Sequence, residues 1–129
     1  KVVAQGETFY QPAQALKSAQ TMLQARSDIN LIVGADQGAL GAQQALGGKK
    51  VVLIGYGGGA VGLKAVKAGR WFGTVMQRPA TEGRLAMQCV IKAVKTGKGC
   101  GGIDVLASLP NGGVVTRANA SKFKAEWPG

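Results

Sequence analysis

Histidine is absent from this chain of 129 residues, and cysteine occurs only twice, as Cys89 and Cys100. Zinc sites and Cys–His catalytic pairs are built mainly from these two residue types. The sequence therefore gives little support to a zinc site or to Cys–His catalysis. Two interpretations of the cysteines stay open. Gly97 and Gly99 let the chain fold back along a helix and form a disulfide, or one thiol is buried and the other lies in a loop.

Acidic residues are also scarce, with 6 against 16 lysines and arginines, which gives a net charge of +10. No nucleophile–base pair can be assembled from so few acids, and Asp28, Asp104 and Glu126 look peripheral, so an enzyme is not expected. The bases are spread over predicted helix surfaces and ends, with only short pairs such as Lys49-Lys50. The sequence also lacks the alternation of aromatic and basic residues that stacks on nucleic-acid bases. We therefore interpret the basic residues as a solvated face, or as half of a larger protein whose other half is acidic.

No apolar run approaches the roughly 20 residues that span a bilayer, and no signal peptide is visible. Aromatic residues make up only 5% of a chain that is 46% hydrophobic, so a core of Val, Leu, Ile and Ala is expected in a single domain. The chain begins directly in a strand-like run at Lys1–Ala4. This predicts an internal start, as in a fragment or a processed product.

Two units match at an offset of 21 residues, Leu31–Lys49 and Val52–Arg70. Each passes from a β-branched apolar run through glycine into an Ala-rich helical pattern, and each ends at glycine followed by a base. A repeated strand–turn–helix unit is typical of a parallel sheet with crossover helices. Ligands bind such sheets at the carboxyl ends of the strands, so Gly34–Gly38 and Gly55–Gly59 are the turns of interest.

Hydrophobic periodicity predicts four strand–helix pairs followed by extended segments. Helices are expected at Gln11–Ala25, Gln37–Leu46, Ala60–Ala68 and Pro79–Thr96. Strands are expected at Lys1–Gln5, Leu31–Ala35, Val51–Tyr56 and Phe72–Gln77, with short strands or extended segments at Ile103–Leu109 and Gly113–Thr116. The predicted fold is a three-layer α-β-α lobe with a mainly parallel open sheet and helices on both faces. Residues 1–97 would form the βα repeats of this single domain, and residues 98–129 extended segments and a tail.

The turn Gly57–Gly62 satisfies the G-x-G-x-x-G pattern of dinucleotide-binding proteins. The acidic residue that binds the ribose should follow near the end of the next strand, but that strand ends in Met76-Gln77-Arg78. The repeat offers a simpler explanation, because Gly41 and Gly62 are equivalent and each lets a helix pack closely on its sheet. Both interpretations stay open at this stage.

Polar residues at the predicted strand ends are candidates for ligand contact. Asp36 is either the N-cap of the following helix or a ligand contact. Gln77 offers two donors and an acceptor for a hydroxyl group, or simply closes a strand. Tyr56 lies at the end of the third strand or packs its ring into the core.

Several segments resemble type I periplasmic sugar-binding proteins. Asn30–Leu46 resembles the family strand that ends in "x-N-D" and runs into "ALGA…AL", and Val51–Gly58 resembles the "VVGFDG" strand. Pro79 opens a long helix at the family spacing, and Gly113–Asn119 resembles the "VxVTxxN" close. The resemblance covers nearly the whole chain but only the second half of a family member, so the amino-terminal lobe and the helix before the first strand are missing.

The resemblance implies two lobes that close by a hinge on a sugar and deliver it to an ABC importer. The family's cleft Asn falls on Ala35 and its cleft Asp on Gly57, while Asp36 and the crossover Gln77 are retained. With Tyr56, these are the predicted ligand-binding residues. Losing two hydroxyl-binding groups predicts a less hydroxylated or differently charged ligand, and Gly57–Gly59 would leave space or N–H groups for an anion. Residues 98–129 would link to the missing lobe.

The expected partners are a small sugar-like solute, an importer permease, the missing amino-terminal lobe and, for the lone lobe, a second copy. The expected location is periplasmic or extracellular, with a lipid anchor in a Gram-positive organism, and a Cys89–Cys100 bridge would favour export. No cofactor is expected. Two alternatives remain, the ligand-sensing core of a lac-repressor-type regulator and a nucleotide-binding enzyme domain that uses the Gly57–Gly62 turn.

Overall fold

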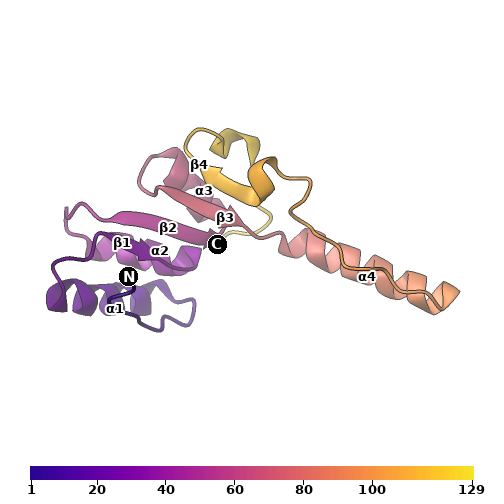
Figure 1. Cartoon of the computed structure of the whole chain (residues 1–129), viewed down its shortest axis with the longest axis horizontal. Coiled ribbons are helices and arrows are strands. Elements are labelled where there is room, and N and C mark those ends of the chain that lie inside the picture. The colour runs from indigo at the N-terminus through magenta and orange to yellow at the C-terminus, as the bar shows by residue number, and fades with distance from the viewer.

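The computed structural model describes residues 1–129 and contains four helices that alternate with four strands (Figure 1). The helices are α1 (Pro12–Ala25), α2 (Asp36–Ala45), α3 (Ala60–Lys67) and α4 (Pro79–Thr96). The strands are β1 (Leu31–Val33), β2 (Val52–Gly57), β3 (Gly73–Met76) and β4 (Val114–Thr116). Two short 3₁₀ turns, Pro110–Gly113 and Ala120–Lys122, flank β4. The predicted helices are confirmed to within two residues at each end.

The strands form one sheet in the order β1-β2-β3-β4, with the first three parallel and β4 antiparallel to β3. This confirms the mainly parallel open sheet. The strand predicted at Lys1–Gln5 is wrong. Residues 1–8 adopt no regular secondary structure and pair with no strand of the sheet, and Lys1–Gln5 line a cavity of about 1330 Å³ together with β1 and α1. Ile103–Leu109 is not a strand either, because a turn occupies residues 105–108.

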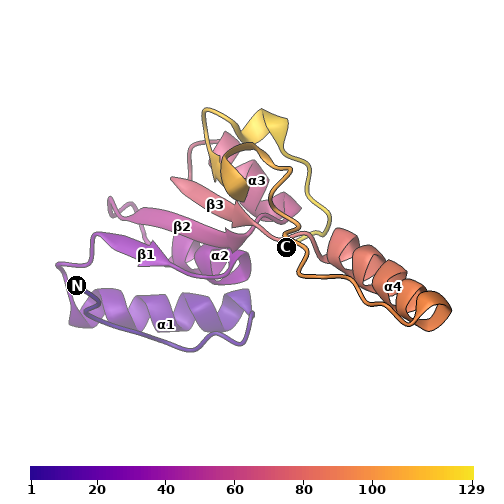
Figure 2. The same cartoon turned by 45° about the vertical axis from the view of Figure 1, so that its right-hand side comes forward.

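Helices cover only one face of the sheet. On β2, Leu53, Gly55 and Gly57 are buried beneath the helices, whereas Val52 and Tyr56 are about half exposed. Helix α1 packs against α2 rather than on the opposite face (Figure 2). The uncovered side is called the open face, and it consists of Leu31, Val33, Val52, Ile54, Tyr56, Val75 and Val114.

The predicted third layer is therefore absent from the structure, although the α/β class is confirmed. The physical reason is the direction of the crossovers. The chain moves from β1 to β2 to β3 without reversing, and right-handed crossovers that run in one direction place their helices on the same face.

Close packing between α1 and α2 depends on Gly41. A Cβ atom at this position would lie 2.6 Å from the Cβ of Ala15 and 2.7 Å from the backbone nitrogen of Leu16. Gly62 instead abuts the side chain of Asp36. Both glycines permit close packing, as the repeat predicts, but against a helix and a carboxylate rather than against the sheet.

Helix α4 projects away from the body of the molecule and buries none of its residues (Figure 1). It ends at Gly97, whose φ of 68° is left-handed, and the following loop runs back along the helix. A disulfide between Cys89 and Cys100, with Cα atoms 5.5 Å apart, ties this loop to the helix, so of the two interpretations left open by the sequence the bridged one is correct. No helix of the chain is both long and apolar enough to cross a membrane.

We expect Gly41→Ala to lower the free energy of unfolding by about 1–3 kcal/mol, because the new methyl group overpacks the α1–α2 contact. Gly83→Ala in α4 is the matched control, since nothing lies within 4 Å of its Cβ position. This control should raise helix stability by about 0.5–1 kcal/mol. Urea unfolding followed by circular dichroism measures both, and an equal response of the two variants would contradict the close contact.

Candidate functional site

The carboxyl ends of the three parallel strands meet at one edge of the sheet, which is called the carboxyl edge. It carries Ala35 after β1, Tyr56 and Gly57 at the end of β2, and Gln77 after β3. The edge is held together by the backbone, because the N–H of Gln77 donates to the carbonyl oxygen of Gly57 at 2.9 Å. The topology thus brings these predicted residues to one side of the molecule.

The carboxylate of Asp36 joins three segments behind this edge. It begins α2, where its Oδ2 accepts a hydrogen bond from the Gly59 N–H at 2.8 Å, and its Oδ1 accepts one from the Thr74 hydroxyl at 2.8 Å. Asp36 is fully buried. Burial raises the pKa of the Asp36 carboxyl above its ordinary value, although the bonds from Thr74, Gly59 and Gly58 oppose the increase.

These contacts correct both interpretations of Asp36. The N-cap of α2 is Ala35, and no side chain makes a capping hydrogen bond. A ligand contact does not fit this conformation either, because the carboxylate has no exposed surface and both of its oxygens accept bonds from within the chain. Asp36 therefore acts as a support for the turn after β2.

The N–H groups of the glycine-rich turn are also used internally. Gly58 donates to the Thr74 hydroxyl at 3.4 Å and Gly59 to Asp36. The next two N–H groups, of Ala60 and Val61, donate at 3.0 and 3.1 Å to the carbonyl oxygens of Trp127 and Pro128. The chain's own tail occupies the position that a phosphate would take at the start of α3. This overturns the nucleotide interpretation and the suggestion that Gly57–Gly59 leaves N–H groups for an anion.

The remaining predicted residues line an open edge rather than an enclosed site. Tyr56 is 50% exposed on the open face and does not enter the core. The side-chain amide of Gln77 is half-buried and makes no hydrogen bond within the chain. Of the predicted residues, only Ala35 lines the 1330 Å³ cavity, which lies between α1, β1 and residues 1–10. A ligand at the carboxyl edge would therefore be covered on one side only.

Sequence reasoning missed one polar group at this edge. Gln37, the second residue of α2, holds a buried side-chain oxygen that has no hydrogen-bond partner. A buried acceptor without a partner is costly unless a donor is supplied from outside the chain. In the sequence, Gln37 could have been noticed because it follows Asp36 directly after the end of a predicted strand.

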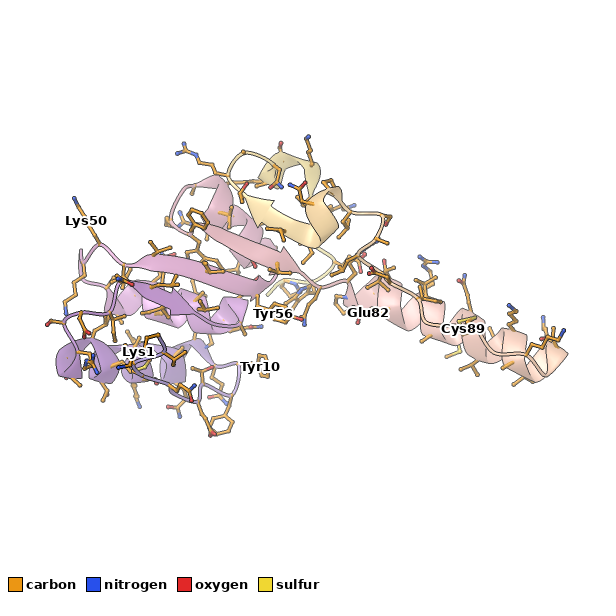
Figure 3. The ribbon with its side chains drawn as sticks, in the orientation of Figure 1. Lys1, Tyr10, Lys50, Tyr56, Glu82 and Cys89 are labelled. Atoms are coloured by element: carbon orange, nitrogen blue, oxygen red, sulfur yellow. A yellow bond between two sulfur atoms is a disulfide. The ribbon has the colours of Figure 1, made fainter.

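Glu126 is not peripheral, because its carboxylate bonds Arg78 and Thr81 at the junction with α4. Figure 3 labels Glu82, which lies in the first turn of this helix. The Glu126 carboxylate pairs with Arg78 at 3.0 Å and accepts hydrogen bonds from the backbone N–H and hydroxyl of Thr81. Desolvation pushes its pKa upward, but the bonds from Thr81 and Arg78 prevail and hold the pKa of Glu126 below its ordinary value. The two members of this ion pair are 48 residues apart in sequence, which concealed the contact.

No three His, Cys, Asp or Glu side chains come together in an arrangement that could hold a metal ion. The polar groups at the carboxyl edge carry no charge. They consist of two amides, a phenol and backbone groups, which suit hydrogen bonding to an uncharged polar molecule.

Comparison with known proteins places this geometry in context. Residues 1–99 match the family described as "Periplasmic binding protein domain". A ribose import binding protein from Haemophilus influenzae is 31% identical over 97 residues, which cover 73% of this chain and 33% of that protein. The chain thus spans about a third of the length of this curated relative.

Solved structures of ABC transporter solute-binding proteins share the fold. One from Agrobacterium vitis with bound D-fucose has a TM-score of 0.78 and 26% identity, over 95% of this chain and 42% of that chain. One from Actinobacillus succinogenes 130z with bound D-allose has a TM-score of 0.78 and 23% identity, over 95% and 44%. One from Bacillus halodurans C-125 with bound myo-inositol has a TM-score of 0.79 and 24% identity, over 95% and 42%.

We expect Thr74→Val to destabilise the chain by about 1–3 kcal/mol, because it removes the hydroxyl that bonds a buried carboxylate. Thr21→Val is the matched control, since the exposed Thr21 hydroxyl bonds only to the carbonyl oxygen of Lys17 within α1. Urea unfolding measures both variants. If Thr74→Val lowers the free energy of unfolding no more than Thr21→Val does, the hydrogen bond from Thr74 to Asp36 does not have the proposed stabilising role.

The raised pKa of Asp36 predicts the sign of a pH dependence. Between the ordinary Asp value of about 3.9 and the raised value, the folded chain binds a proton more tightly than the unfolded chain. The unfolding free energy, compared with that of Asp36→Asn, should therefore fall as pH rises through this window and then level off. Urea titrations at a series of pH values test this, and a difference that grows with pH would refute it.

Proposed function

Because the chain belongs to the periplasmic binding protein family, we propose that it forms one lobe of a solute-binding protein that captures a small polar ligand for an ABC importer. The unfinished site at the carboxyl edge is the observation that carries this proposal. The edge presents the partly exposed amide of Gln77, and the neighbouring Gln37 holds a buried side-chain oxygen that has no partner within the chain. The solved relatives are more than twice as long as this chain.

Helix α4 supports the presence of a second lobe. Its residues Met87, Val90, Ile91 and Val94 follow helical spacing and are 46–82% exposed; this set is called the α4 stripe. An exposed apolar stripe on a helix that leaves its own body indicates a partner surface. We propose that the second lobe packs on this stripe. In a lone chain, the stripe and the open face would favour pairing of two copies, and a monomeric mass at high micromolar concentration would exclude such pairing.

The junction between the body and α4 has the features of a hinge. The chain leaves the body near Arg78 and returns near Val105, and the Arg78 guanidinium bonds the Val105 carbonyl oxygen at 3.0 Å. Glu126 fixes the same guanidinium from the body. Two chain segments that cross between the body and α4 and are bonded to each other at Arg78 would let the second lobe rotate about this point while the packing inside each lobe is kept.

The ligand that fits this edge is uncharged and polar. The two acceptors of the family cleft are replaced by Ala35 and Gly57, Asp36 is buried, and Arg78 is paired with Glu126. Gln77 would bond hydroxyl groups, with Tyr56, Ala35 and Gly57 lining the edge and Asp36 holding the turn. The relatives were solved with D-fucose, D-allose and myo-inositol. We therefore propose a neutral sugar or polyol that presents few hydroxyl groups to this lobe.

An exported location agrees with the Cys89–Cys100 bridge, since disulfides persist in oxidising compartments. The proposed partners are therefore the ligand, the second lobe and the membrane permease of the importer.

A thermal-shift screen tests the proposed function. The polypeptide extended by its second lobe should be stabilised by about 2.7 kcal/mol by a neutral sugar or polyol held 100-fold above its dissociation constant, and the 129-residue chain much less. Gln77→Ala should weaken binding roughly two- to tenfold, as loss of one neutral hydrogen bond does. Gln44→Ala, at an exposed position of α2, should leave binding unchanged. A response only to phosphosugars, or equal responses of both polypeptides, would reject the proposal.

A further inference from the structure

Exposed bases gather at the edge of the sheet opposite the carboxyl edge. This set is called the basic edge, and it consists of Lys49, Lys50, Lys67, Arg70 and Arg117. Figure 3 shows Lys50 and Tyr56 toward opposite ends of β2. The basic edge is thus as far from the proposed ligand site as the sheet allows.

The topology explains why bases from distant parts of the sequence meet here. Parallel strands begin at one edge, so Lys49-Lys50 before β2 and Arg70 before β3 lie on the same side. Helix α3 runs back toward this side and ends at Lys67. Strand β4 is antiparallel and ends here too, which brings Arg117 within 3.4 Å of the Cβ position of Gly69. The dispersed bases of the sequence therefore form one surface in the fold.

Acidic residues do not neutralise this surface. None occurs between Asp36 and Glu82, and the acid nearest in the topology, Asp28 before β1, is already paired with Arg26 at 2.7 Å. A large apolar side chain stands among the bases, because Phe72 is 67% exposed. Its neighbour Trp71 is buried and bonds Gln43, so of these two aromatic rings only Phe72 is exposed and can act as an apolar anchor.

We propose that the basic edge docks on an anionic phospholipid surface. Several exposed bases on one side of a small domain are attracted together to a charged plane, and each contributes roughly a fivefold gain in binding. An aromatic ring among them inserts at the level of the headgroups. A nucleic acid is disfavoured, because a single exposed ring offers no stacking platform for successive bases. Docking at this edge leaves the carboxyl edge uncovered and open to ligand.

Co-sedimentation with vesicles tests the proposal. The chain should bind vesicles of phosphatidylcholine mixed with phosphatidylglycerol, should not bind phosphatidylcholine alone, and should be released at 1 M salt, where the screening length falls to about 3 Å. The triple variant K50Q/R70Q/R117Q should bind roughly 100-fold more weakly, as expected for three bases. These side chains are exposed and make no hydrogen bond within the chain, so its thermal midpoint should be unchanged.

The control variant K92Q/K95Q/K98Q removes the same charge from exposed positions in the last turns of α4 and in the loop just after it. It should keep binding within tenfold of the unmodified chain. A separate variant, Phe72→Ser, should weaken binding several-fold without changing the net charge. Equal losses in the two triple variants would show attraction by net charge alone and overturn the proposal. Binding to phosphatidylcholine alone, or tighter binding to single-stranded RNA than to the anionic vesicles, would overturn it as well.

Discussion

The buried carboxylate of Asp36 is the constraint on which the carboxyl edge depends. It fixes the start of α2, the turn after β2 and the middle of β3 through bonds to Gly59 and Thr74. Positions 55 and 62 must lack a side chain, because a Cβ atom at Gly62 would lie 2.7 Å from the carboxyl carbon of Asp36 and one at Gly55 would meet its Oδ1. The glycines of this region therefore make room for a carboxylate of the chain itself, and not for a bound phosphate.

Much of the fold could be predicted because it is encoded locally. The repeat of β-branched runs, glycine turns and Ala-rich helices indicates a parallel sheet, and Gly97 and Gly99 permit the Cys89–Cys100 bridge. The third layer and the strand at Lys1–Gln5 were wrong because both depend on what packs beside a segment, which local pattern does not report. The roles of Asp36 and Glu126 depend on partners 38 and 45 residues away, and no spacing rule connects them.

The structure separates three surfaces with different chemistry. The carboxyl edge is neutral and has unused hydrogen-bonding groups, the α4 stripe is apolar, and the basic edge is charged. Under the proposed function, they would give a lobe that holds one side of a ligand, joins a second lobe through the projecting helix, and keeps its charge away from both. The Arg78–Glu126 pair lies between the body and α4, where a hinge would transmit closure.

Small-angle X-ray scattering of the polypeptide extended by its second lobe, with and without a saturating neutral sugar or polyol, tests the two-lobe clamp most directly. The account predicts that the radius of gyration falls when ligand binds, because the lobes close on the carboxyl edge. An unchanged radius of gyration, together with full binding by the 129-residue chain alone, would contradict it.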